Sequence, residues 1–156
     1  MTEIDLLLAQ IDQAYNRRSW HGTNLRGSIR GMRARDAAWR PRAGRHSVQE
    51  IVVHAAYWKY TVRRRLAGDR RGSFQLAGSN WFPRPQADED LWRQDLRLLD
   101  DSHRLMRATI AAMDPRRLPR TVGGSTTALE LVTGIIAHDL YHAGQIQLLK
   151  RLRADA

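Results

Sequence analysis

Cysteine is absent from this chain of 156 residues. Without cysteine the chain has no disulfide framework and no thiolate that could ligate a metal. Any metal site must therefore be built from histidine, aspartate or glutamate side chains, and the six histidines are the first residues to consider.

Long apolar runs are also absent. No stretch approaches the roughly 20 residues that a membrane-spanning helix needs, and the start of the chain lacks a signal-peptide pattern. We therefore expect no membrane partner and a cytoplasmic location. A hydrophobic content of 42% with five tryptophans indicates a folded chain. The length predicts one domain over residues 1–156.

Lysine is scarce although the net charge is +10. Of the 26 basic residues only Lys59 and Lys150 are lysines, and the arginines are spread over every segment. Clustered cations would indicate nucleic-acid binding, because they release counterions from phosphates. Scattered arginines favour solvated faces instead, so we do not expect a nucleic-acid partner. Arginines beside a pocket for an acidic small molecule are at least as consistent with the composition.

Apolar residues recur at helical spacing in four segments, and no segment reads as a strand. The predicted helices cover about residues 3–18, 48–67, 88–113 and 128–152, with a short helical piece around 25–32. Four helices of roughly 16–26 residues predict an all-α four-helix bundle, although spacing alone does not fix the connection order.

Local signals mark the helix ends. Ser47 with Glu50, and Thr127 with Glu130, have the spacing of a capping box. Gly68 is expected to end the second long helix. The segment that follows, 68–87, is long for a structureless loop in a small domain and contains Trp81 and Phe82. Such a loop is expected to pack over something, as a lid or rim would.

Two histidines lie four residues apart in the apolar segment AHDLYHAGQIQLL, residues 137–149. His138 and His142 are about 40° apart in helical projection and one turn apart in height, so both rings point into the bundle. With this spacing one helix can present two imidazole nitrogens to one metal ion. His54, at the inner edge of the second long helix, is the natural third ligand. Three imidazoles leave at least one coordination position open, as in catalytic sites.

Two other interpretations of these histidines are weaker. A single buried histidine is usually a core residue whose N–H meets a carbonyl, but a pair on one apolar stripe with a third on another helix favours a metal. HDLYH also resembles the HExxH helix of metalloproteases. However, Asp139 projects about 100° away from His138, and no histidine or glutamate follows His142 as a further ligand.

Residues near the predicted ligands are candidates for the pocket. Gln145 lies about 60° from His142 and could donate to a bound water or anion. Trp58 and Tyr57 could wall the pocket, although aromatic residues in a bundle first serve the core. His21 could approach the open side of the metal, or it is a plain loop histidine. No side chain stands out as a general base, so the catalytic residues are left unassigned.

For two further positions in the predicted helices we expect a structural role. Gly144, inside a helix, suggests that another helix or a ligand approaches closely there. His103, beside Asp100 and Asp101, is expected to be an ordinary surface residue with an acidic partner.

Together, His54 in IVVHAAYW, the HxxxH of the last helix and GQI at 144–146 resemble the DinB/YfiT-like superfamily of metal-binding bundles. The resemblance covers about residues 4–152. It implies an up-down-down-up bundle, often a dimer, that holds zinc or nickel, with the ligands mapping onto His54, His138 and His142. Similar proteins include thiol transferases that use bacillithiol, mycothiol or glutathione.

These observations predict a metal-dependent enzyme acting on a small-molecule substrate. A bound ion would lower the pKa of a thiol or a water. The lack of an obvious base favours thiol-dependent S-transfer to a small electrophile, with a low-molecular-weight thiol as co-substrate. Two alternatives stay open. One is a metal-dependent hydrolase that uses metal-bound water, and the other is a non-catalytic basic module that binds nucleic acid or a partner.

Overall fold

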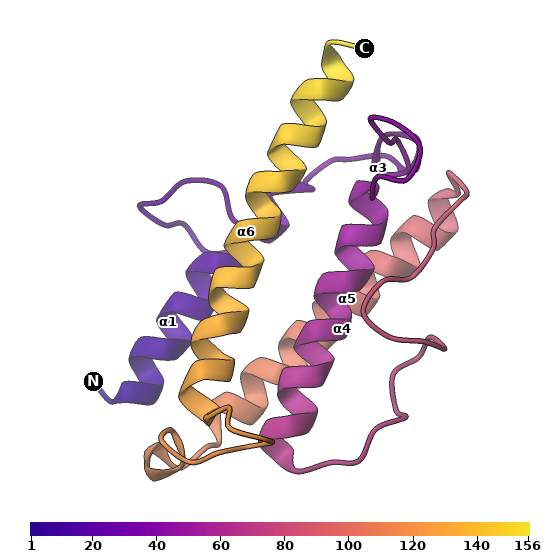
Figure 1. The fold of residues 1–156 in the computed structure, drawn as a ribbon. Helices are drawn as coiled ribbons and strands as arrows, with labels where there is room; N and C mark the ends of the chain where they lie inside the picture. The colour runs from indigo at the N-terminus through magenta and orange to yellow at the C-terminus, as the bar shows by residue number, and fades with distance from the viewer.

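The computed structural model describes residues 1–156 and contains six α-helices and no β-strand (Figure 1). The all-α prediction is thus confirmed. A short 3-10 turn, Pro115–Arg117, follows the fifth helix. The helices are α1 (Glu3–Tyr15), α2 (Leu25–Ser28), α3 (Ala34–Ala37), α4 (Val48–Ala67), α5 (Glu89–Ala111) and α6 (Ala128–Ala154).

The four longer helices form the bundle. α4 packs against α5 and α6, and α1 packs against the same two helices, so α1 and α4 occupy opposite corners. In Figure 1, α1 and α6 run upward whereas α4 and α5 run downward. The short helix α2 packs on α6, and α3 packs on both α4 and α5.

The predicted capping boxes fix the start of the two helices that matter most for the site. The Ser47 side chain accepts from the Glu50 N–H, and the Glu50 carboxylate accepts from the Ser47 N–H. Thr127 and Glu130 do the same at the start of α6. At the other end of α4, Gly68 has φ +78°, a left-handed conformation that glycine adopts without strain.

The structure differs from the predicted boundaries near the N-terminus. α1 ends at Tyr15, three residues before the expected Arg18, and Asn16 caps it. The expected piece around 25–32 is only one turn, α2, which begins at the N-cap Asn24. Gly31 has φ +71°, so the chain turns there before α3.

Two hydrophobic clusters fill the core, one at each end of α4. The first packs residues 48–56 against the first half of α5 and Ile146, and the second packs the end of α4 against Met106 and Val132. Between them lies a buried polar layer formed by Lys59, His103 and Asp139. The core is therefore interrupted by buried polar and charged side chains near the middle of α4.

Candidate metal centre

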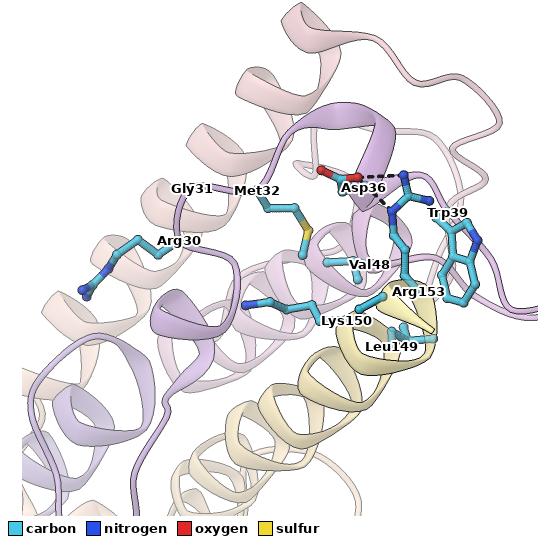
Figure 2. Close-up of a pocket in the computed structure, with 10 residues that line it drawn as sticks. Arg30, Gly31, Met32, Asp36, Trp39, Val48, Leu149, Lys150 and Arg153 are labelled. Atoms are coloured by element: carbon cyan, nitrogen blue, oxygen red, sulfur yellow. Dashed lines mark hydrogen bonds and ion pairs between the residues drawn. The ribbon is translucent and has the colours of Figure 1, made fainter. Parts of the chain in front are cut away.

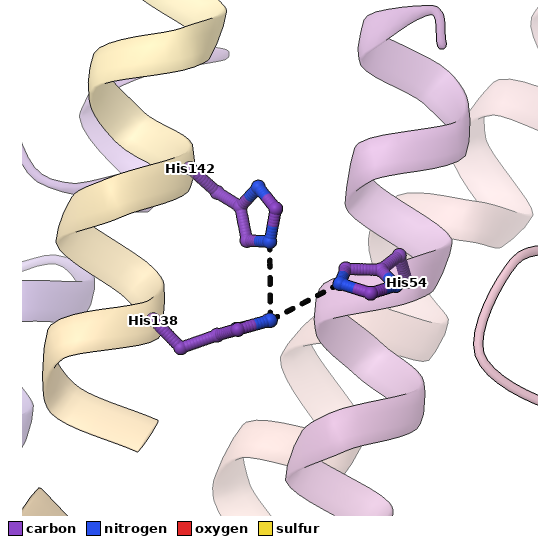
Figure 3. A group of neighbouring side chains, drawn as sticks. All are labelled: His54, His138 and His142. Carbon is purple, nitrogen blue, oxygen red and sulfur yellow. Dashed lines mark hydrogen bonds between the residues drawn. The ribbon is translucent and has the colours of Figure 1, made fainter. Parts of the chain in front are cut away.

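Three histidines from two helices converge in the space between α4 and α6 (Figure 3). His54 lies on α4, and His138 and His142 lie one turn apart on α6. The Nε2 atom of His138 is 3.1 Å from the Nε2 of His54 and 3.1 Å from the Nε2 of His142. These are the only histidine, aspartate or glutamate side chains that form a group of three able to hold a metal ion.

Hydrogen bonds orient two of the three rings. His54 Nδ1 lies 2.8 Å from the carbonyl oxygen of Asn80, and His142 Nδ1 lies 2.6 Å from Oε1 of Gln145. Because both partners are acceptors, each Nδ1 carries the proton and each Nε2 is left with a free lone pair. Buried metal-binding histidines are held in the same way by an acceptor on the far nitrogen.

The converging nitrogens cannot satisfy one another. Only the His138 ring is free to carry a proton on Nε2, and one N–H cannot serve two lone pairs that each lie 3.1 Å away. A cation removes this conflict. Imidazole nitrogens bind zinc at about 2.0–2.1 Å, which is compatible with neighbouring nitrogens about 3 Å apart. The donor set and its spacing therefore fit a divalent ion.

The environment keeps the three rings neutral, the form that binds a metal. Burial, with His142, His54 and Lys59 nearby, lowers the pKa of His138 to about 3. Burial also lowers the pKa of His142 to about 4, although the hydrogen bond with Gln145 acts in the opposite direction. For His54, burial again lowers the pKa, partly opposed by the Asn80 carbonyl.

The segment between α4 and α5 covers one side of the site. Trp81 stacks on His54, with ring centroids 3.9 Å apart and planes within 11°. Asn80 holds two neighbours at once, because its carbonyl accepts from His54 and its Oδ1 accepts from the indole of Trp58 at 3.0 Å. Asn80 has φ +65°, the only positive φ outside glycine. The loop thus packs over the site, as its length and aromatic content predicted.

The other predicted pocket residues differ in how close they lie to the three histidines. Gln145 contacts His142 directly and also donates to the Tyr141 hydroxyl. Trp58 lies edge-on to His54 at 6.3 Å, while Tyr57 packs on Trp58 and on Phe74. His21 is exposed in the turn between α1 and α2 and makes none of the contacts that join the three ligands.

Two expectations from the sequence were wrong. His103 is not a surface residue: it is 6% exposed and stacks on Tyr15 with centroids 3.5 Å apart. Asp100 instead pairs with Arg26 and Tyr15. Gly144 is exposed, and a Cβ placed there would meet nothing within 4 Å. The structure therefore shows no close approach at this glycine.

Two features beside the site were not predicted from the sequence. His46 stacks on the other face of Trp81 at 3.6 Å, and its Nδ1 lies 3.2 Å from Glu50. Lys59 and Asp139 form a fully buried ion pair with 2.5 Å between Nζ and Oδ2. A lysine in the middle of an apolar helix face indicates that a buried acidic partner is present. No pattern in the sequence predicts the stacking of His46 on Trp81.

The Glu50 carboxylate that holds His46 is itself firmly ionised. Burial alone would raise its pKa, but hydrogen bonds from the Arg40 side chain, the Arg84 backbone and His46 lower it to about 2. Arg40 pairs with both Glu50 oxygens, at 2.6 and 2.7 Å. His46 is therefore fixed beside the centre by an anion that is itself held in place.

Two cavities lie near these helices. The larger has a volume of about 1070 Å³ and includes Trp58 in its wall. A second cavity, of about 410 Å³, lies between α3 and the end of α6 (Figure 2). Two of its polar groups, Arg153 and Asp36, are paired with each other at 2.7 Å. Leu149 in its wall is seven residues beyond His142, about 10 Å along the helix. The smaller cavity is therefore not part of the metal centre.

Several arginines form ion pairs that join parts of the fold. Buried or half-buried guanidinium groups pair with Asp100, Glu50, Asp95, Asp12 and Asp36. These pairs account for part of the basic composition without a nucleic acid.

No helix in the structure is both long enough and apolar enough to cross a membrane.

Comparison with known proteins gives one result. The family model described as the DinB superfamily matches residues 17–146, a range that includes His54, His138 and His142. No curated protein and no solved structure matches the chain.

Proposed function

The chain belongs to the DinB superfamily, and from this premise we propose that it is a metal-dependent enzyme acting on a small-molecule substrate. The observation that carries the proposal is the convergence of three Nε2 atoms, with that of His138 3.1 Å from each of the other two and with the outer nitrogens of His54 and His142 already bound to acceptors. Three protein ligands leave a coordination position open for a substrate.

We propose thiol-dependent S-transfer as the reaction. A divalent ion, zinc or nickel, would supply the lowered pKa that turns a thiol of a low-molecular-weight co-substrate into a nucleophile. The residues of this chain would hold the ion and keep water out: His54, His138 and His142 as ligands, Gln145 and Asn80 as the groups that orient them. Trp81 would cover His54 on the loop side.

A hydrolase is the second candidate, and His46 is the observation that favours it. Glu50 accepts from His46 Nδ1 at 3.2 Å, which leaves Nε2 as a proton acceptor on the far side of Trp81 from His54, so that this role requires the Trp81 ring to move aside. Such a base is needed to activate water but not to use a thiol that has already lost its proton.

Assays with metal-loaded and chelator-treated protein test both candidates. Thiol-dependent transfer predicts that a thiol is consumed by an electrophile such as 1-chloro-2,4-dinitrobenzene only when metal is present, and that His46→Gln retains this activity. Hydrolysis predicts that aryl esters or amides are cleaved without thiol and that His46→Gln loses at least ten- to a hundredfold in rate. Activity that survives both metal removal and His138→Ala would refute the metal-dependent enzyme.

We also propose that the chain forms a homodimer through α6. Tyr141, Leu148 and Leu152 are 64%, 58% and 43% exposed, although they are large and apolar. They recur at spacings of seven and four residues, which puts them along one face of the helix. Light scattering tests this: Tyr141→Lys with Leu148→Lys is expected to convert a dimer into a monomer, and a monomeric unsubstituted chain would contradict it.

A further inference from the structure

The 1070 Å³ cavity follows one face of α4 from Tyr57 and Trp58, beside the metal centre, to the end of the helix. Trp58, Thr61 and Arg65 line it at spacings of three and four residues, and residues of the loops at 69–79 and 122–124 form the opposite wall. The volume is at the upper limit of cavities that enclose small organic ligands, roughly 300–1,000 Å³. The space therefore suits a ligand larger than a simple thiol or a single amino acid.

One end of this cavity is separated from the metal centre by Trp58. The ring of Trp58 is 6.3 Å from those of both His54 and His138, and it also forms part of the cavity wall. Ser79, the residue before Asn80, lines the cavity as well. Arg65 lies eleven residues beyond His54, which is about 16 Å along the helix. A ligand that spans the cavity must therefore be elongated.

The other end carries uncompensated positive charge. Arg64, Arg65 and Arg71 line it, and the only acidic residue in the wall is Asp69, whose carboxylate pairs with Arg63 at 2.9 Å. Arg65 donates to the Gly123 carbonyl at 2.8 Å and Arg64 to the Asp69 carbonyl at 3.1 Å, so both are held in place without losing charge.

Arg71 makes no hydrogen bond and no ion pair. Between the two ends the wall is aromatic, with Tyr57 and Phe74 edge-to-face at 5.3 Å. The cavity thus has an apolar middle and a cationic end.

We propose that this cavity binds an elongated organic anion whose carboxylate or phosphate lies among Arg64, Arg65 and Arg71 and whose reactive end reaches the three histidines past Trp58. Guanidinium groups recognise the paired oxygens of both anions by parallel hydrogen bonds. The aromatic middle would contact an apolar body. The contact with the histidines rests on the proposed function, whereas recognition of the anion by the arginines does not.

Thiol probes of one length and different head groups test the proposal. The probes are 11-mercaptoundecanoate, 11-mercaptoundecyl phosphate and the uncharged 11-mercaptoundecanol, used below the concentrations at which they form micelles. In cobalt-loaded protein, thiolate-to-cobalt absorption reports binding at the histidines; in metal-free protein, calorimetry reports binding by the arginines alone. Arg71→Gln is compared with Arg97→Gln, another exposed arginine without a partner, on α5.

At least one acidic probe is expected to bind about tenfold more tightly than the alcohol. Arg71→Gln should reduce this preference severalfold in both preparations, because Arg64 and Arg65 remain, and Arg97→Gln should retain it in full. Which acid binds more tightly identifies the anion as carboxylate or phosphate. If cobalt gives no absorption while the Arg71 effect persists in calorimetry, the metal function fails and the anion site stands. Equal binding of the acids and the alcohol, or equal effects of the two arginine variants, would overturn the proposal.

Discussion

Gln145 and Asn80 determine, at the scale of single residues, which nitrogens face the centre. Each accepts from the outer nitrogen of a histidine, so the inner nitrogens of His142 and His54 carry lone pairs. The carbonyl of Asn80 belongs to the backbone and cannot be removed by substitution. Gln145 can be replaced, which makes it the residue that tests this orienting role.

Replacing Gln145 with leucine keeps a side chain of similar size but removes the acceptor. We expect the affinity for zinc to fall ten- to a hundredfold, the effect typical of lost partners to metal-binding histidines. Competition with a chromophoric chelator measures this. Gln10→Leu, on the exposed face of α1, serves as the control, and equal affinities for the two variants would contradict the orienting role.

His103 makes the stability of the protein depend on pH. Burial, with Lys59 and Arg107 nearby, lowers its pKa to about 2, so the folded state keeps this ring neutral where the unfolded chain protonates it near pH 6.5. The unfolded state therefore binds more protons between these values. The free energy of unfolding should fall as the pH drops below about 6.5, by up to about 1.4 kcal/mol per pH unit from this group.

The variant His103→Phe retains a ring that can stack on Tyr15 and removes the titration. In metal-free protein, urea unfolding between pH 6 and pH 4 should give a slope against pH that is shallower by up to about 1.4 kcal/mol per unit. His21→Phe, at an exposed position, should leave the slope unchanged. An unchanged slope in the His103 variant would show that the ring is protonated in the folded protein.

Helix caps position the ligands at the scale of secondary structure. Ser47 is fully buried and caps α4, the helix that carries His54. Ser47→Ala should lower the free energy of unfolding by about 1 kcal/mol or somewhat more, because the Glu50 N–H loses its acceptor in a buried position. Thr2→Ala, which removes the exposed cap of α1, should lower the free energy of unfolding by less. Chemical denaturation compares them, and a larger cost at Thr2 would refute this ranking.

The Lys59–Asp139 pair joins α4 to α6 next to His138. Burial lowers the pKa of Lys59 and raises that of Asp139, and their mutual attraction opposes both shifts. Lys59→Met or Asp139→Leu alone should lower the free energy of unfolding by about 3–5 kcal/mol, because each leaves a buried charge without its partner. The double variant should recover most of this loss. A double-mutant cycle by urea unfolding measures the coupling, and strictly additive losses would show that the two residues do not act as a pair.

The bundle helices and the pair His138 and His142 were predictable because their signals are local, whereas His54, 84 residues before His138, was assigned to the site from its place on the inner edge of another helix. Helical spacing of apolar residues, the capping boxes at Ser47 and Thr127 and the i, i+4 pair at His138 all lie within a few turns of chain. The partners of the polar layer were not predictable, because Lys59 and Asp139 lie 80 residues apart. His46 and His54 are brought together by Trp81 from a third segment, so only the folded chain shows their relation.

At the scale of the whole molecule, the bundle brings two groups of side chains to one face of α4. The metal centre lies at mid-height, where α6 packs against α4, and the cationic cavity continues along α4 to its end. A net charge of +10 also raises the local concentration of anionic molecules, which favours acidic substrates. The proposed enzymatic function depends on the three histidines acting as one binding site.

Metal content measured by atomic emission on protein reconstituted with zinc and then desalted tests that dependence most directly. The unsubstituted chain and His21→Ala are expected to retain about one ion per chain, because three imidazoles with open lone pairs are a sufficient donor set for a catalytic-type site. His54→Ala, His138→Ala and His142→Ala should each retain almost none. A chain with His138→Ala that still holds one ion would contradict the account.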